Sequence, residues 1–364
     1  MMSKKQHYDI EPILKTGAQY LIIIGQRSNG KSYACKRYAL EQAWNNPETS
    51  KFALLRRKKE GIKHREMTQY FSDMSEAIKE ISGGEADCIV EYQKVFFFAK
   101  RDPEGKEAPQ KIREAGYVFA LSAEEDYKSS IYMDIHSIIY EEFITKQYYL
   151  RQEPTLLMSF VSTIFRSREG KVFLIGNTIS RVCPYVTDWG LHNLLRQKQG
   201  TIELYHAMDP ELLDDEGEPI VTDIAVEFCS DTAARSSMFI GRASKSIIKG
   251  VWDTELKPGL RFPPHEYQQI HEMVIQVMNF KFYCRLLSRQ NTMVWYVEPK
   301  TSEIQKGTRV ISDRFNESRL WSKGFYPLND KEAYAFNLLK QGKICFSDSL
   351  TGTDFEQCLK HLTL

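Results

Sequence analysis

The chain has 364 residues, and its 49 Lys and Arg against 48 Asp and Glu give a formal net charge of +1. Hydrophobic residues make up 42% and charged residues 27%, a globular mixture that excludes a disordered chain. No apolar run approaches the roughly 18 residues of a membrane span, and the N-terminus lacks the apolar segment of a secretion signal. The seven cysteines include no Cys-x-x-Cys pair, which excludes a zinc knuckle and indicates reduced residues of a soluble cytosolic protein.

The first half of the chain alternates short apolar strands with helical patterns. Each strand is followed by polar residues, and alternation of this kind predicts an α/β domain with a mostly parallel sheet. Ligands bind such sheets at the carboxyl ends of the strands. In chain order we expect a strand at 20–24, a helix at 31–44, a strand at 52–55, a charged helical segment at 67–78, a hairpin at 89–98, a loop at 100–111, a strand at 138–140, a helix at 154–166 and a strand at 172–175.

The second half has a different character. The stretch 209–219 is rich in acids and contains two prolines, so we interpret 205–235 as a solvated linker. Beyond it, strands at 281–287 and 293–297 form a hairpin around 288–291, and helices follow at 330–341 and 354–362. The expected domains are therefore 1–204, which is the α/β domain, and 236–364, which is a smaller α/β or α+β domain.

A phosphate-binding loop is the most specific motif. It matches G-x-x-x-x-G-K-[ST], follows a strand and opens a helix, as this motif requires. Its backbone N–H groups face phosphate oxygens, Lys31 reaches the β- and γ-phosphates, and the Ser32 hydroxyl binds Mg²⁺. The predicted nucleotide-binding residues are Gly25, Gln26, Arg27, Ser28, Asn29, Gly30, Lys31 and Ser32.

Two carboxylates follow the strand at 138–140, as in a Walker-B strand. Glu141 would hold the metal ion and Glu142 would polarise the attacking water. Most such sites have Asp in the first position, so Glu141 is a departure. Asn177, at the tip of the next strand, is suited to contacting the γ-phosphate, although a polar residue there is also typical of a turn.

Two groups of basic residues complete the set of candidates. Arg166 could neutralise transition-state charge in a neighbouring subunit, but from the residues alone a solvated or acid-paired arginine is the preferred explanation. Residues 51–65 hold seven Lys and Arg against one acid. They include Arg56, Arg57 and Lys59, and they fit a contact with a DNA backbone, a lid over the nucleotide or a solvated helix face.

The order of these motifs resembles the DNA-packaging (encapsidation) ATPases of small protein-primed tailed phages of the Picovirinae type. The matching stretches run over residues 10–195. They are the loop at 23–34, Arg56-Arg57, Tyr70-Phe71, Lys128-Ser129, Glu142-Phe143-Ile144, 165–169, Asn177 and Pro184-Tyr185.

The resemblance implies an ASCE-type, RecA-like P-loop ATPase that binds ATP and Mg²⁺. It further implies a homo-oligomeric ring, typically a pentamer, which drives double-stranded DNA through the portal protein into a prohead. Such a motor works in the host cytoplasm, is attached to the prohead transiently, and is absent from the mature virion and from membranes. Whether a packaging RNA or the portal forms the docking surface stays open.

The resemblance also assigns roles to individual residues. Glu142 becomes the catalytic carboxylate, Glu141 stands where the family has Asp, and Arg166 is an arginine finger acting in trans. Lys128 acts across the subunit interface, and Lys59 faces DNA or closes over the nucleotide.

The C-terminal domain is expected to resemble a degenerate RNase H-type nuclease. Nuclease activity in that fold requires an acid in the first central strand, and the strand at 281–287 contains none. We therefore expect nucleic-acid binding without cleavage.

Two other functions remain open from the sequence. One is a P-loop phosphotransferase, which would explain the loop but not the two strand-end acids. The other is a non-catalytic module that binds nucleic acid and keeps a nucleotide only for structure, which the unusual Glu141 favours.

Overall fold

The structure is a computed structural model, and it describes residues 8–166, 168–191, 193–213, 219–230, 252, 254–290, 292–305, 307–318 and 320–362. These residues form two compact units. The first holds 8–178 and 188–230, and the second holds 179–187 and 252–362. No helix in the described ranges is long and apolar enough to cross a membrane.

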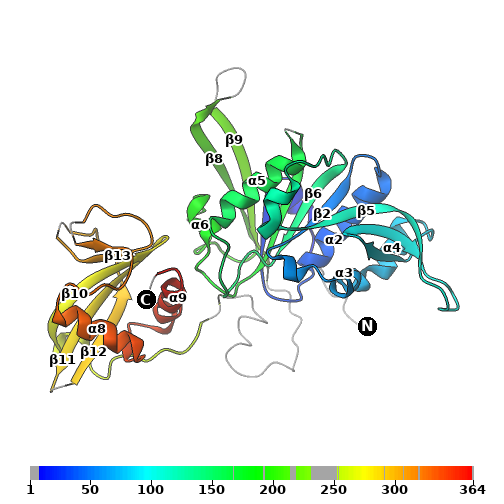
Figure 1. Cartoon of the computed structure of the whole chain (residues 1–364). Helices are drawn as coiled ribbons and strands as arrows, with labels where there is room; N and C mark the ends of the chain where they lie inside the picture. Colours follow the sequence, from blue (N-terminus) through cyan, green and yellow to red (C-terminus); the bar gives the residue numbers. More distant parts are fainter. Residues whose placement is uncertain are drawn as a thin grey trace. The chain divides into compact units, whose positions relative to one another are not determined.

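The first unit is built on a nine-stranded sheet with the order β3-β4-β5-β2-β6-β7-β1-β9-β8 (Figure 1). Its strands are β1 (Tyr20–Gly25), β2 (Lys51–Arg56), β3 (Cys88–Tyr92), β4 (Val95–Lys100), β5 (Gln110–Ala120), β6 (Ile135–Glu141), β7 (Lys171–Asn177), β8 (Thr201–Leu213) and β9 (Pro219–Phe228). The segment β5-β2-β6-β7-β1-β9 is parallel throughout, whereas β3, β4 and β8 join in antiparallel pairs. One strand, β7, lies between the strand of the phosphate-binding loop and the strand of the two carboxylates.

Helices cover both faces of this sheet, which explains why its strands are continuous apolar runs. Leu21 and Ile23 of β1 belong to a core cluster with residues of α2 (Lys31–Asn45), α3 (His64–Tyr70) and α4 (Ser75–Ile81). Helix α5 (Glu153–Phe165) packs against the 3₁₀ segment η3 (Leu121–Tyr127), and its Phe160 ring lies 5.3 Å from the Phe119 ring. Shorter elements of this unit are α1 (Glu11–Leu14), η1 (Lys59–Gly61) and η2 (Ser72–Met74), whereas α6 (Pro184–Asp188) lies almost wholly in the second unit.

The expected linker at 205–235 is wrong wherever its residues are described. β8 and β9 form an antiparallel hairpin, and β9 joins the sheet beside β1 with Tyr20 opposite Ile224. The apolar run Ile224–Val226 is buried there, so this segment completes the sheet instead of leaving it. Residues 214–218 and 231–235 of the expected linker lie outside the described residues.

The second unit contains a six-stranded sheet with the order β14-β13-β10-β11-β12-β15. Its elements are β10 (Gln268–Val277), β11 (Phe280–Arg289), β12 (Thr292–Pro299), β13 (Val310–Ser312), β14 (Trp321–Ser322), β15 (Ile344–Phe346), α8 (Asp330–Lys340), α9 (Ser349–Leu359) and η4 (Pro264–Glu266). The hairpin and both helices expected here are confirmed. An RNase H-type fold for this unit stays a prediction.

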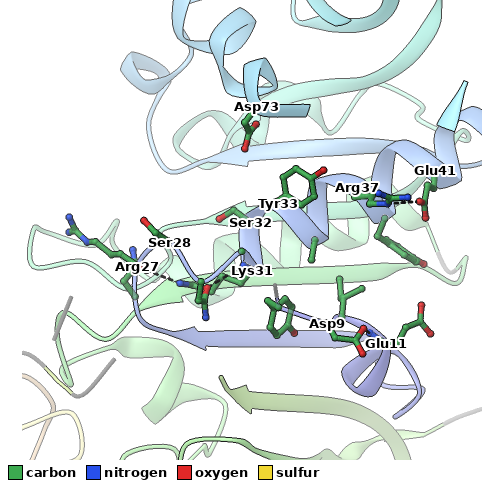
Figure 2. Close-up of a pocket in the computed structure, with 17 residues that line it drawn as sticks. Asp9, Glu11, Arg27, Ser28, Lys31, Ser32, Tyr33, Arg37, Glu41 and Asp73 are labelled. Atoms are coloured by element: carbon green, nitrogen blue, oxygen red, sulfur yellow. Dashed lines mark hydrogen bonds and ion pairs between the residues drawn. The ribbon is translucent and has the colours of Figure 1, made fainter. Parts of the chain in front are cut away.

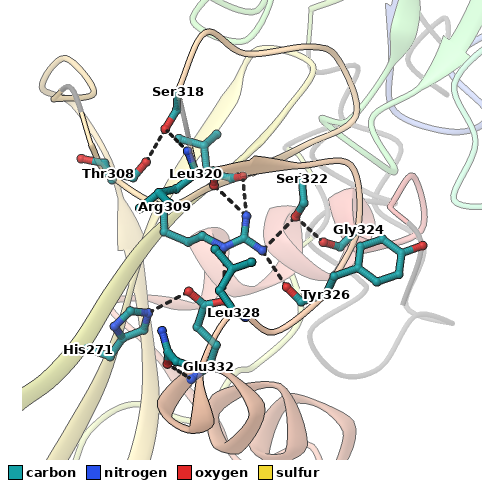
Figure 3. A network of polar contacts seen from close by, with 12 residues as sticks. His271, Thr308, Arg309, Ser318, Leu320, Ser322, Gly324, Tyr326, Leu328 and Glu332 are labelled. Carbon is teal, nitrogen blue, oxygen red and sulfur yellow. Dashed lines mark hydrogen bonds and ion pairs between the residues drawn. The ribbon is translucent and has the colours of Figure 1, made fainter.

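A buried ion pair organises the second unit (Figure 3). Arg309 and Glu332 are 3% and 1% exposed, and Arg309 Nε lies 3.2 Å from Glu332 Oε2. The same guanidinium donates to the carbonyls of Leu320 and Tyr326 at 2.7 and 2.8 Å. The two charged side chains are buried, so each of them would lose its charged partner if the pair were broken. The pair therefore fixes the irregular segment between β13 and α8.

From the sequence, the stretch 281–287 is expected to be the first central strand of this domain, and that position needs correction. The stretch 281–287 lies in β11, but the three-stranded meander opens with β10, which carries Glu272. The Glu272 carboxylate accepts hydrogen bonds from the Tyr283 hydroxyl and from Gln269 Nε2. In the part of the chain that the structure describes, no three His, Cys, Asp or Glu residues gather into a group that could hold a metal ion.

A glycine tests the packing of the first sheet. Gly116 on β5 faces Phe52, and an added Cβ would lie 2.4 Å from the Phe52 carbonyl oxygen. We expect Gly116→Ala to lower the free energy of unfolding by about 1–3 kcal/mol, because backbone cannot move aside cheaply. Thermal or urea unfolding measures this, and Gly61→Ala, where the nearest atom is at 3.7 Å, is the matched control. Equal stability of both variants would contradict this packing.

Candidate nucleotide site

The phosphate-binding loop joins β1 to α2 at the carboxyl edge of the sheet. Gly30 has a φ of 96°, a left-handed conformation that glycine adopts without strain, and it directly precedes the first residue of α2. The loop lines a cavity of about 940 Å³ together with Ser32, Asn177 and residues 8–11. Figure 2 shows this cavity, with Arg27, Ser28 and Lys31 on one side and Asp9 and Glu11 on the other.

The Lys31 ammonium group is held in place by two acceptors, one within the loop and one at the end of β7. It is 4% exposed, and its Nζ donates to the Gln26 carbonyl at 2.6 Å and to Asn177 Oδ1 at 2.8 Å. Burial lowers the pKa of Lys31 to about 8, because a desolvated ammonium group is costly. Since β7 pairs directly with β1, Gly25 is opposite Asn177, and the structure brings the predicted strand-tip asparagine to the predicted lysine.

Glu141 and Glu142 follow β6 and differ in environment. Glu141 is half-buried, and its Oε1 has no hydrogen-bond partner among the described residues. Glu142 is exposed and has a φ of 57°. This left-handed conformation costs a non-glycine residue about 1–2 kcal/mol, so the surrounding structure must hold it.

The residues suit a magnesium ion. Mg²⁺ prefers oxygen ligands, and the Ser32 hydroxyl and the Glu141 carboxylate are oxygen donors on neighbouring parts of this edge. The buried, unpartnered Glu141 Oε1 is an acceptor that such a cation would satisfy. Glu in place of Asp is therefore compatible with metal binding.

Arg56 and Arg57 turn toward this site, and a DNA contact by either of them stays a prediction. Arg56 Nη1 lies 3.7 Å from Glu141 Oε2, and its guanidinium lies over the Tyr70 ring at 5.0 Å. Burial, and then the charge of Glu141, raise the pKa of the Tyr70 phenol well above its ordinary value. The sequence stretches 56–57, 70–71 and 141–143 are thus neighbours in space.

Arg57 is occupied by a buried acid and by backbone. It forms a bidentate pair with Glu153, and it donates to the carbonyls of Glu142 and Phe143. Sequence reasoning missed Glu153, because an acid in the first turn of a helix usually stabilises the helix dipole from the surface. Here it is 1% exposed, and nothing in the sequence marks it as buried.

Lys59 and Lys128 remain on the surface. Lys59 is 62% exposed and pairs with the exposed Asp126 at 2.9 Å, whereas Lys128 is 52% exposed and lies 3.4 Å from the buried Glu124. Both ammonium groups are accessible to a partner. The structure leaves their predicted roles possible without assigning them.

Arg166 and Arg168 have opposite environments although they are two residues apart. Arg166 is exposed and ends α5 in a left-handed conformation with φ 45°. Among the described residues its guanidinium makes one hydrogen bond, to the Ser130 carbonyl at 2.9 Å. Arg168 donates to the carbonyls of Met133, Ile135, Tyr132 and Ile164. Arg168 therefore holds the fold, whereas Arg166 is free to contact another molecule.

Comparison with known proteins places the chain in a family. The family model described as Podovirus DNA encapsidation protein (Gp16) matches residues 2–215, more than half of the chain. This chain belongs to that family. The match includes the phosphate-binding loop, both carboxylates and Arg166.

Individual relatives share part of the chain. The DNA packaging protein of Bacillus phage B103 is 28% identical over 173 residues, which are 46% of this chain and 47% of that protein. The DNA packaging protein of Bacillus phage phi29 is 26% identical over 188 residues, half of each chain. The chain therefore aligns with about half the length of the curated relatives it matches.

A solved structure extends the likeness in fold to the second unit. It is that of "The bacteriophage Phi-29 viral genome packaging motor assembly", with a TM-score of 0.57 and 19% identity, covering 98% of this chain and 99% of that chain. The expected fold class, a P-loop domain followed by a smaller α/β domain, is thus confirmed. At this identity the likeness concerns the fold alone.

The two arginines after α5 give a direct test. We expect Arg168→Ala to lower the free energy of unfolding by about 2–4 kcal/mol, because several carbonyls lose a charged donor. Arg166→Ala should leave the melting temperature nearly unchanged, since an exposed side chain with one bond contributes little. Thermal unfolding of both variants measures the difference, and equal destabilisation would contradict the two environments.

Proposed function

We propose that this protein is an ATPase that drives double-stranded DNA into a phage prohead through the portal. The observation that carries the proposal is the convergence of Lys31, Asn177, Glu141 and Glu142 at one edge of the sheet, in a member of the encapsidation family. The packaging-motor fold of both units supports it. A phosphotransferase would not require the paired strand-end acids.

The chemistry follows from the positions of these groups. The loop N–H groups and Lys31 bind the phosphates of ATP, and Ser32 and Glu141 would hold Mg²⁺, which would supply positive charge next to the phosphates. Phosphate oxygens next to Lys31 would raise its lowered pKa again. Glu142 accepts the proton of the attacking water, for which its exposed position suits it.

Completion of the site requires a second subunit. Arg166 ends α5 with an exposed guanidinium, so we propose that it reaches the nucleotide of a neighbouring copy in a homo-oligomeric ring, with five subunits as the expected number. Lys128 is proposed to contact the same interface. The ring would act in the host cytoplasm on the prohead and be absent from the mature virion, docked on the portal or on a packaging RNA.

Subunit mixing tests this proposal. ATP hydrolysis should fall about 10²–10⁴-fold in Lys31→Ala and Glu142→Gln, and about 10³-fold in Arg166→Ala, measured with double-stranded DNA and proheads. An equimolar mixture of Arg166→Ala and Glu142→Gln should recover activity, because one supplies the carboxylate and the other supplies the finger. DNase-protected DNA in the proheads should return with it.

Three outcomes would contradict the proposal. If Arg166→Ala hydrolyses ATP at the normal rate and DNA does not change that rate, the ring-motor proposal is wrong. Transfer of phosphate to an acceptor other than water would indicate a phosphotransferase. If the wild-type protein binds DNA but does not hydrolyse ATP, it is the non-catalytic nucleic-acid-binding module.

Lys59 offers a test of the DNA contact. Its ammonium group is exposed, and the neighbouring Lys58, Lys63 and Arg65 are exposed as well. We expect Lys59→Ala to weaken DNA binding equally for all sequences and to reduce the slope of log K against log salt by about 1, because one phosphate contact is lost. Lys79→Ala is the control, since Lys79 is also exposed and acid-paired but lies on α4. An unchanged slope in Lys59→Ala would place the contact elsewhere.

A further inference from the structure

A buried ion pair lies next to the backbone of Glu142. Arg57 Nε donates to Glu153 Oε2 at 2.8 Å and Arg57 Nη2 donates to Glu153 Oε1 at 3.1 Å, which is a bidentate pair. The two side chains are 14% and 0% exposed. Removal of either partner would leave the other charge desolvated, so the pair is a rigid unit.

Glu153 is held by further donors. Its carboxylate accepts from the Tyr140 hydroxyl at 2.7 Å and from the Leu150 N–H at 2.8 Å. Tyr140 belongs to β6, the strand that ends at Glu141, and Leu150 belongs to the segment between β6 and α5. The carboxylate therefore ties both ends of that segment to one point.

The Arg57 guanidinium also donates hydrogen bonds to the backbone of the two residues that follow β6. Nη1 donates to the Glu142 carbonyl at 3.2 Å and Nη2 donates to the Phe143 carbonyl at 2.9 Å. The rings of Tyr140 and Tyr149 lie 5.7 and 5.1 Å from the guanidinium carbon. Glu142 adopts the left-handed φ of 57°, which it would leave if nothing fixed its carbonyl.

We propose that Arg57 and Glu153 are positioning residues that hold Glu142 in the orientation needed to activate water. This inference rests on the proposed function, because it takes Glu142 to be the catalytic carboxylate. Arg57 contacts the backbone of Glu142 and not its carboxylate, so it acts on orientation. Lysine cannot replace it, since one ammonium group cannot span the carboxylate and both carbonyls in a planar fork.

Kinetics of the full chain with DNA and proheads test the proposal. In Arg57→Ala and Arg57→Lys, kcat should fall about 10²-fold, the usual effect of a misplaced catalytic group. The dissociation constant of a non-hydrolysable ATP analogue should stay within about threefold, because the phosphate-binding loop is untouched. Free guanidinium should partly restore Arg57→Ala and leave Arg57→Lys unchanged.

A double variant separates positioning from general stability. If Arg57 acts through Glu142, Arg57→Ala should lower the residual turnover of Glu142→Gln by less than about twofold. Arg113→Ala is the matched control, since Arg113 also donates to a carbonyl, that of Trp44, and lies over its ring, but it belongs to β5. Amide exchange over 142–152 should accelerate in Arg57→Ala and stay unchanged in Arg113→Ala.

The results that would contradict the positioning role of Arg57 differ from those that would contradict the proposed function. The positioning role is overturned if analogue affinity falls in parallel with kcat, if the two losses multiply in the double variant, or if exchange over 142–152 is unchanged. Full turnover by Glu142→Gln would instead overturn the proposed function. The exchange measurement would then decide on its own whether Arg57 orders this segment.

Discussion

Parallel pairing of β1, β7, β6 and β2 is the constraint on which the site depends. Parallel strands end at the same edge, so the segments that follow them must meet there. Residues more than a hundred positions apart, Lys31 and Asn177, thus form a hydrogen bond of 2.8 Å. Helices on both faces bury these strands and leave the carboxyl edge as the place where polar side chains gather.

The same edge is a region of desolvated charge, and its buried lysine and its arginines have specific partners. Lys31 is buried, and its lowered pKa records the cost of that position before phosphate is bound. Arg56 faces Glu141, and Arg57 faces Glu153. Groups fixed in this way need little reorganisation when a nucleotide arrives, which is what electrostatic catalysis requires.

Arginines that are close together in this sequence have different contacts, because their tertiary environments differ. Arg56 and Arg57 are adjacent in the sequence, yet Arg56 faces the Glu141 carboxylate and Arg57 donates to the backbone of Glu142. Arg166 and Arg168 divide in the same manner between an exposed position and a clamp on four carbonyls. A basic cluster in a sequence therefore does not by itself indicate a nucleic-acid contact.

The sequence by itself determined the local features: the phosphate-binding loop, the apolar strands, the helices α2, α5, α8 and α9, and the two acids after β6. These follow from periodicity and from residue types that only a few backbone conformations accept. Only the tertiary structure decided the rest. Residues 209–213 of the acidic stretch lie in β8, which pairs with β9, and β9 in turn pairs with β1. Glu153 is buried because Arg57, which follows β2 and lies almost a hundred residues away in the sequence, pairs with it. Pairing between distant segments leaves no periodic signal in either of them, so these features appear only when the chain is folded.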